Sequence, residues 1–175
     1  MTVVPVLSMP AADITHPVPD LTGYITEGQV VLTREVQARA VYPPVDPLSS
    51  LSRLMRSGVG AGRTRTGHVE LAAQILAALA RARQVRELAE IVGTAALSGT
   101  DQLYLRFETE FEHRVVDQGR RDARSLDETF ARCLDVLRIL PRRELSMLPP
   151  DLLEDVFESS EAREPRAPDE RAEGG

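Results

Sequence analysis

The spacing of apolar residues separates a first third of the chain without helical periodicity from a longer region that has it. After a glycine-rich stretch at residues 58–62, Leu71, Ile75 and Leu79 recur at every fourth position, and the apolar stripe continues to Gly93. This interval places apolar side chains on one face of an α-helix. The pattern therefore predicts a long amphipathic helix that Gly93 ends.

A second helix is predicted between Gly93 and Gly119, with Ser98 or Thr100 as its N-cap. Its apolar face has four members at strict fourth spacing: Leu103, Phe107, Phe111 and Val115. Such regular spacing is typical of a helix that buries one side against a neighbour.

A third helix begins at Ser125, which forms a capping box with Glu128, and ends at Pro141. Residues 144–157 predict a short further helix that two consecutive prolines break. Residues 158–175 are polar, contain prolines and have almost no apolar side chains, so we expect an acidic, disordered tail.

The first third has a different pattern. Residues 2–7 form a short segment rich in valine, which predicts a strand. Gln29–Leu32 predicts a second strand after a proline-rich loop. Thr33 is suited to cap a short helix through Val41, which two prolines then end. The glycines at 58–62 indicate a hinge between this part and the helices, and the chain as a whole is expected to be mainly α.

Composition narrows the function. The net charge is −6, and no region is strongly basic, which argues against a nucleic-acid partner. All 21 basic residues are arginine, so a Schiff-base lysine and a P-loop lysine are excluded. The single cysteine, Cys133, forms no internal disulfide and suits a reducing compartment. No apolar run is long enough for a membrane span, so we expect a soluble, intracellular protein without direct membrane insertion.

Local motifs for chemistry are weak. Ser57–Thr64 resembles a phosphate-binding loop, but Ser57 replaces its first glycine and Arg63 replaces its lysine, which favours a flexible hinge. The three histidines and Cys133 lack ligand spacing, so no metal site is expected. Glu108, Glu110 and Glu112 alternate along the second helix, and we expect them to lie on different faces in solvent.

Arg53 is the position that we single out from the residues themselves. It lies in the segment Leu51–Met55, which is otherwise apolar or small. A planar guanidinium is suited to bidentate contact with a phosphate. Composition alone leaves a surface or salt-bridging role open, because Arg53 is one of 21 arginines.

A longer likeness adds evidence about function. Several segments occur in the order found in one family: Val6–Pro10, Asp13–Gln29, Tyr42–Pro44, Ser50–Met55, Gly60–Arg65, Gln74, Val92–Gly93, Ala96–Leu97, Tyr104–Leu105, Phe107, Phe111–Glu112 and Gln118–Gly119. In these segments the chain resembles the B subunit of V-type and archaeal-type (A-type) rotary ATPases, from about residue 3 to 157. Two departures are that Val45–Leu48 looks more like F-type catalytic subunits and that Arg63 stands where a lysine is usual.

The resemblance implies the C-terminal portion of a non-catalytic subunit. Residues 1–62 would be the end of a RecA-like α/β nucleotide-binding domain, residues 63–157 a C-terminal helical bundle, and residues 158–175 the tail. The β-barrel and most of the sheet would be absent, as in a truncated, split or partial chain. Without neighbouring strands, Val3–Leu7 would expose an unpaired edge.

Site residues follow from the same resemblance. Arg53 matches the arginine that the family projects across the subunit interface to the nucleotide on the catalytic A subunit, the role of an arginine finger. Tyr24 matches a tyrosine near the adenine of the interface nucleotide, and Ser52 flanks the finger. The implied ligands are ATP and ADP in the intact complex, with none for the isolated chain.

The leading hypothesis is therefore a regulatory B subunit, or a fragment or short homologue of one, in an ATP-driven or ATP-forming proton-transporting complex. Its partners would be the catalytic A subunit and the central rotor shaft, and it would lie in the cytoplasm, peripheral to the membrane. We expect no ATPase activity from the chain alone. The alternatives are a free-standing helical protein-interaction module, a decayed remnant without an ATPase role, and an independent small enzyme.

Overall fold

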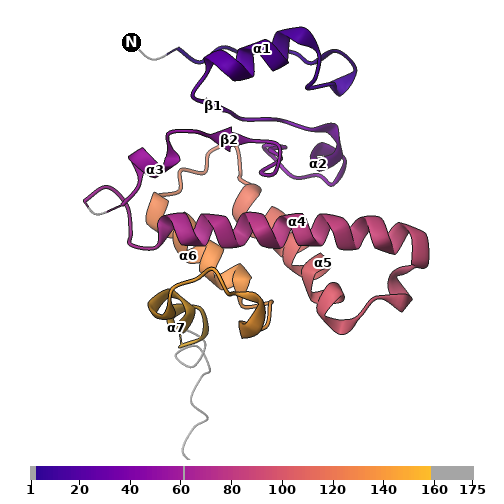
Figure 1. Ribbon diagram of the computed structural model, residues 1–175, viewed down its shortest axis with the longest axis vertical. Coiled ribbons are helices and arrows are strands. Elements are labelled where there is room, and N and C mark those ends of the chain that lie inside the picture. The colour runs from indigo at the N-terminus through magenta and orange to yellow at the C-terminus, as the bar shows by residue number, and fades with distance from the viewer. Residues whose placement is uncertain (1–2, 61, 159–175) are drawn as a thin grey trace, which may run out of the picture.

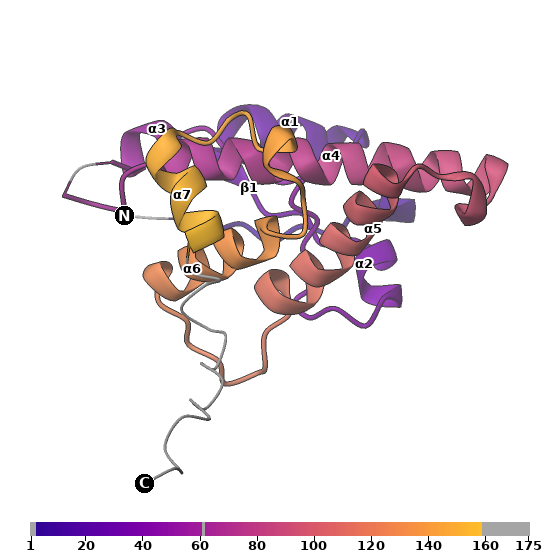
Figure 2. The ribbon, with the colours of Figure 1, turned by 90° about the horizontal axis from the view of Figure 1, so that it is seen from below.

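The computed structural model describes residues 3–60 and 62–158, and its architecture is mainly helical. Figure 1 shows the long helix α4 (His68–Val92) lying between residues 3–60 on one side and α5 (Gly99–Phe111) and α7 (Pro150–Glu158) on the other. Helix α6 (Leu126–Leu137) completes the bundle, and Figure 2 shows α6 and α7 side by side. The sequence prediction of a helical bundle from α4 onward is confirmed.

The helix boundaries follow the expected signals. Gly93 is the C-cap of α4, and the Ser98 hydroxyl accepts the N–H of Asp101 at the start of α5. Ser125 and Glu128 form the complete predicted capping box of α6. The Ser98 and Ser125 side chains each satisfy an amide that lacks an intrahelical partner at a helix start.

Two details of the helices differ from the prediction. Helix α5 ends at Phe111, and a π-helical turn, Glu112–Val116, continues it. Pro150 is the first residue of α7, so the prolines start this helix and do not break it. A proline fits the first turn because the N–H that it lacks has no helical partner there.

One apolar core joins the helices. It combines Leu71, Ile75 and Leu79 of α4 with Phe107 and Phe111 of α5, the predicted faces. The remaining helices supply Phe130, Leu134 and Leu137 from α6 and Leu152 and Val156 from α7. Among the described residues before α4, Leu48 packs against this core.

The first 60 residues are built from short elements: the 3-10 turn Pro10–Ala12, helix α1 (Pro17–Ile25), strand β1 (Gly28–Gln29), helix α2 (Arg34–Ala38), strand β2 (Leu51–Ser52) and helix α3 (Met55–Gly58). Strands β1 and β2 are antiparallel, with Gly28 opposite Ser52. Here we call residues 26–53, which contain both strands, the hairpin segment.

Four predictions for this part need correction, and the first two concern residues before β1. Val3–Leu7 is not a strand but an exposed segment without regular structure. A strand needs a partner for its backbone amides, and the described residues offer none to this segment. The proline-rich stretch after it holds helix α1, because Pro17 and Pro19 occupy its first turn, where proline is tolerated.

The other two predicted elements are shorter than expected. Strand β1 covers Gly28–Gln29, while Leu32 forms an isolated bridge with Val45. Helix α2 is capped by Thr33 as predicted but ends at Ala38, before Val41. The predicted disordered tail lies outside the described residues, apart from Glu158, which ends α7. In the part of the chain that is described, no helix is both long and apolar enough to cross a bilayer.

Candidate functional site

Arg53 lies directly after β2 and is hydrogen-bonded to the chain at the end of α1. Its backbone N–H donates to the carbonyl of Glu27 at 2.8 Å. Its guanidinium Nη1 donates to the carbonyl of Thr26 at 2.9 Å and lies 3.5 Å from that of Tyr24. A guanidinium is well placed here, because the last carbonyls of a helix lack partners and carry partial negative charge.

The three residues that the sequence singles out, Tyr24, Ser52 and Arg53, have their backbones near one another at the end of α1. The side chain of Tyr24 is exposed near the end of α1, and Ser52 is exposed in β2. The strands approach closely at Gly28, where a Cβ atom would lie 2.9 Å from the carbonyl oxygen of Leu51. A larger residue at Gly28 would push β2, and with it Arg53, away from α1.

The charge of Arg53 is not neutralised by the described part of the chain. Arg39, Arg81 and Arg83 each form an ion pair with a carboxylate. Arg53 forms none with any residue that the structure describes, and its side chain is exposed. An exposed guanidinium whose backbone is fixed is suited to bind an anion supplied from outside.

The loop that resembles a phosphate-binding loop is closed by its own side chains. The Arg63 guanidinium donates to the carbonyl of Ser57, and the Thr64 hydroxyl accepts the N–H of Gly60 at 3.0 Å. These contacts use the groups that would otherwise face a phosphate.

The histidines and the cysteine occupy separate places. His16 caps α1, His68 packs edge-on against Phe130, and Cys133 is buried in the core, where burial raises the pKa of its thiol to about 11. Within residues 3–60 and 62–158, no group of three or more His, Cys, Asp or Glu side chains is placed to hold a metal ion.

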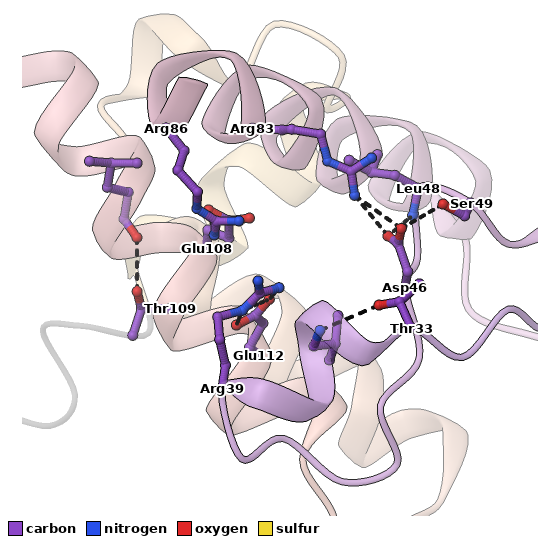
Figure 3. Close-up of polar contacts among 12 residues, drawn as sticks. Thr33, Arg39, Asp46, Leu48, Ser49, Arg83, Arg86, Glu108, Thr109 and Glu112 are labelled. Carbon is purple, nitrogen blue, oxygen red and sulfur yellow. Dashed lines mark hydrogen bonds and ion pairs between the residues drawn. The ribbon is translucent and has the colours of Figure 1, made fainter. Parts of the chain in front are cut away.

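A set of ion pairs that the sequence analysis missed lies where the first 60 residues meet the bundle (Figure 3). This ion-pair cluster consists of Arg39–Glu112, Arg83–Asp46 and Arg86–Glu108. The expectation of solvated glutamates is therefore wrong for Glu108 and Glu112, which are buried. Glu108 on α5 and Glu112 at the start of the π-helical turn that continues it are four residues apart. This spacing, with Arg83 and Arg86 three apart on α4, was the available signal.

Burial and hydrogen bonding act differently on two carboxyls of this cluster. Burial is the largest influence on Asp46 and acts to raise its pKa, but hydrogen bonds from Ser49, Arg83 and the N–H of Leu48 outweigh it and hold the pKa below its usual value. Burial raises the pKa of Glu108, and the opposing charge of Arg86 does not offset it. Asp46 thus favours the charged form, whereas Glu108 carries its charge at a cost.

Known protein families match both parts of the chain. Residues 57–157 match the family described as the C-terminal domain of V and A type ATP synthase. Residues 1–52 match the nucleotide-binding domain of the ATP synthase alpha/beta family. The second match ends at β2, directly before Arg53.

Individual relatives agree. The B subunit of an A-type ATP synthase from Methanopyrus kandleri is 51% identical over 154 residues, which are 88% of this chain and 16% of the relative. A V-type ATP synthase beta chain from Thermotoga neapolitana is 44% identical over 161 residues, 92% of this chain and 35% of the relative. A solved structure, that of NeqB, an ATP synthase subunit from Nanoarcheaum equitans, is 40% identical with a TM-score of 0.69, covering 76% of this chain and 33% of that one.

The chain thus spans about a third or less of the length of these relatives. The fold described above, the long capped helices and their shared core, falls in the range that the first of the two families covers. By that match, which includes more than half of its residues, the chain belongs to the family of the C-terminal domain of V- and A-type ATP synthases, preceded by the end of an alpha/beta nucleotide-binding domain.

Proposed function

We propose that the chain works as the C-terminal portion of a non-catalytic, regulatory B subunit in a proton-translocating V/A-type ATP synthase or ATPase. Residues 1–62 serve as the end of the nucleotide-binding domain, residues 63–157 as the helical bundle, and residues 158–175 as the tail. The two family matches, at 1–52 and 57–157, support this division. The chain alone is not expected to hydrolyse ATP.

Within this complex, Arg53 acts in trans as an arginine finger on nucleotide bound by the catalytic A subunit. The observation that carries this proposal is the state of Arg53: it is exposed, its backbone is fixed by Glu27, and no described carboxylate pairs with it. In the transition state of phosphoryl transfer, negative charge spreads over the phosphoryl oxygens, and a guanidinium in trans stabilises it.

Tyr24 and Ser52 form the rest of the interface nucleotide site, with ATP or ADP as the ligand in the intact complex. The exposed ring of Tyr24 is available to stack against an adenine base, and the hydroxyl of Ser52 lies beside the finger. These roles depend on the neighbouring catalytic chain, which supplies the remaining contacts to the nucleotide.

The bundle faces the central rotor shaft. Its candidate contact is the far end of α4, next to the turn into α5 (Figure 2). Leu88, Ile91 and Val92 expose apolar surface at this end. Exposed apolar groups at the tip of a helix pair are suited to contact another protein. The chain would then lie peripherally, at the cytoplasmic face of the membrane, held there by its partners.

The test is ATP hydrolysis by a complex assembled from the chain and the catalytic A subunit. Arg53→Ala should lower kcat by about 10³-fold or more, while Arg56→Ala, an exposed arginine three residues away, should leave it unchanged. Both variants should co-purify with the A subunit to the same extent. An unchanged kcat for Arg53→Ala would show that the finger assignment is wrong. A chain that never co-purifies with an A subunit would favour a free-standing interaction module.

A further inference from the structure

Arg53 has few apolar anchors of its own. Strand β2 is exposed on both of its residues, and Leu54, which follows Arg53, is exposed as well. The described apolar core of the bundle starts at Leu71, with Leu48 at its margin. The hairpin segment buries three valines, Val31, Val36 and Val41, and it also reaches the bundle through polar contacts.

Asp46 connects the hairpin segment to the bundle. Its backbone N–H donates to the carbonyl of Val31 at 2.9 Å, and its carbonyl accepts from the backbone N–H of Ser50 at 3.1 Å and from the Ser50 hydroxyl at 2.7 Å. The same hydroxyl accepts the N–H of Val31 at 3.0 Å. The backbone of Asp46 thus holds the chain just after β1 and just before β2, the strand that leads into Arg53.

The side chain of Asp46 makes the second half of the connection (Figure 3). Its carboxylate accepts from Arg83 Nη2 on α4 through both oxygens, at 3.0 and 3.1 Å. The Leu48 N–H at 3.0 Å and the Ser49 hydroxyl at 2.5 Å complete its shell. Asp46 is 6% exposed, so this carboxylate is fixed in a nearly closed set of partners.

We propose that Asp46 is a positioning residue for Arg53: paired with Arg83, it transmits the placement of α4 to the hairpin segment and so sets where the Arg53 guanidinium reaches the neighbouring nucleotide. This inference rests on the proposed function of Arg53. It adds a route by which the bundle, through the middle of α4, affects a site at the nucleotide. The two other pairs of the cluster, to Arg39 and Arg86, leave Ser50 and β2 untouched.

The first experiment measures hydrogen–deuterium exchange in the full chain. Arg83→Gln should speed exchange of the Val31, Asp46 and Arg53 amides at least about tenfold, while amides in the middle of α5 stay as slow as before. The matched control is Arg81→Gln, which removes another ion pair of α4, made with Asp101 of α5 and not with the hairpin segment. Equal protection of the three amides in Arg83→Gln and Arg81→Gln would overturn the proposal.

A conservative variant of Arg83 distinguishes its ion pair with Asp46 from the packing of its side chain. Arg83 reaches Asp46 through one nitrogen only, so the single ammonium of Arg83→Lys can make the same contact. We expect Arg83→Lys to keep the slow exchange of the wild type. If it exchanges as fast as Arg83→Gln, the guanidinium acts through packing and the pair is not the connection.

The second experiment measures kcat and KM for ATP in the assembled complex. Arg83→Gln should lower kcat with KM within about twofold, and it should have no further effect in an Arg53→Ala background, because both act on one step. A full additional loss in that background would overturn the positioning role. If Arg53→Ala leaves kcat unchanged, the proposed function of Arg53 fails, and so does the role of Asp46 in the reaction. The exchange data still decide whether Asp46 holds the hairpin segment to α4.

Discussion

Arg39 and Glu112, 73 positions apart, form a two-point ion pair in which Nε donates to Oε2 at 2.8 Å and Nη2 donates to Oε1 at 2.5 Å. The hydrogen bonds to Glu112 raise the pKa of the Arg39 guanidinium above its usual value. Next to this pair, the Tyr42 N–H donates to Asp117 Oδ1, and the Tyr42 carbonyl accepts the Gln118 N–H. Residues 39–42 are thus bound to the bundle although they precede it by many residues.

The geometry of this pair leads to a stability prediction. Arg39→Lys should destabilise the chain by about 1 to 2 kcal/mol, because one ammonium cannot reproduce a contact made through Nε and Nη2. The value stays below that of a fully buried pair because the Arg39 side chain is 34% exposed. Urea denaturation at neutral pH measures it. The control, Arg143→Lys at an exposed pair with Glu144, should change stability by less than about 0.5 kcal/mol, and an equal loss in the two variants would contradict the assigned geometry.

Part of the fold could be predicted from the sequence and part could not. Helices α4, α5 and α6 were predictable because their apolar spacing and N-caps or C-caps indicate the same elements, although α5 and α6 end earlier than Gly119 and Pro141. Helix α1 was not, since prolines usually indicate a loop and only the three-dimensional context shows that they occupy a first turn. Val3–Leu7 has a strand composition but no described partner, and strand formation depends on pairing more than on propensity.

The candidate site divides in the same way. Arg53, Tyr24 and Ser52 are found from a resemblance that names positions, and the fold brings their backbones together at the end of α1. The ion-pair cluster depends on contacts between residues more than 20 positions apart, such as Asp46 with Arg83. Periodicity within one helix shows which face a residue occupies, but it does not show which charged partner will cover that face.

Glu108 gives a prediction for the dependence of stability on pH. Its pKa is raised in the folded chain, so the folded state binds this proton more tightly than the unfolded state does. Stability from this group is therefore full below the ordinary pKa of 4.5 and is lost as pH rises through the folded pKa. Glu108→Gln removes that loss: near neutral pH the variant should be at least as stable as the wild type. Thermal unfolding at a series of pH values measures the difference.

Asp46→Asn is the matched control with the opposite sign. The pKa of Asp46 is lowered, so its charged form contributes stability above the ordinary pKa of 3.8, and this contribution is lost as pH falls through the folded pKa. Asp46→Asn should cost about 1 to 3 kcal/mol at neutral pH, and its difference from the wild type should shrink in acid. If both variants show the same sign at neutral pH, the contrast between the two carboxyls is wrong.

Gly67, at the start of α4, lies close against Leu152 of α7. Its φ is +79°, and a Cβ atom there would overlap with Leu152 Cδ1, part of a buried side chain of α7. Gly67→Ala should therefore destabilise the chain by about 2 kcal/mol or more, from a strained backbone and a displaced leucine. The control is Gly62→Ala, with φ +80° but nothing within 4 Å, which should cost clearly less. Urea denaturation compares the two, and an equal cost would mean that Leu152 moves aside freely.

The last prediction concerns the tip of α4. Ile91 is 83% exposed there, and an isoleucine that becomes buried in an interface contributes about 1.5 to 3 kcal/mol. If this tip contacts the rotor shaft, Ile91→Asp should weaken binding of the purified rotor-shaft protein to the assembled complex at least about tenfold, without lowering the melting temperature of the chain. Leu126→Asp, an exposed apolar residue at the start of α6, is the control and should bind the rotor as the wild type does. Normal binding by Ile91→Asp would remove the tip from the interface and leave the rotor contact to another face of the bundle.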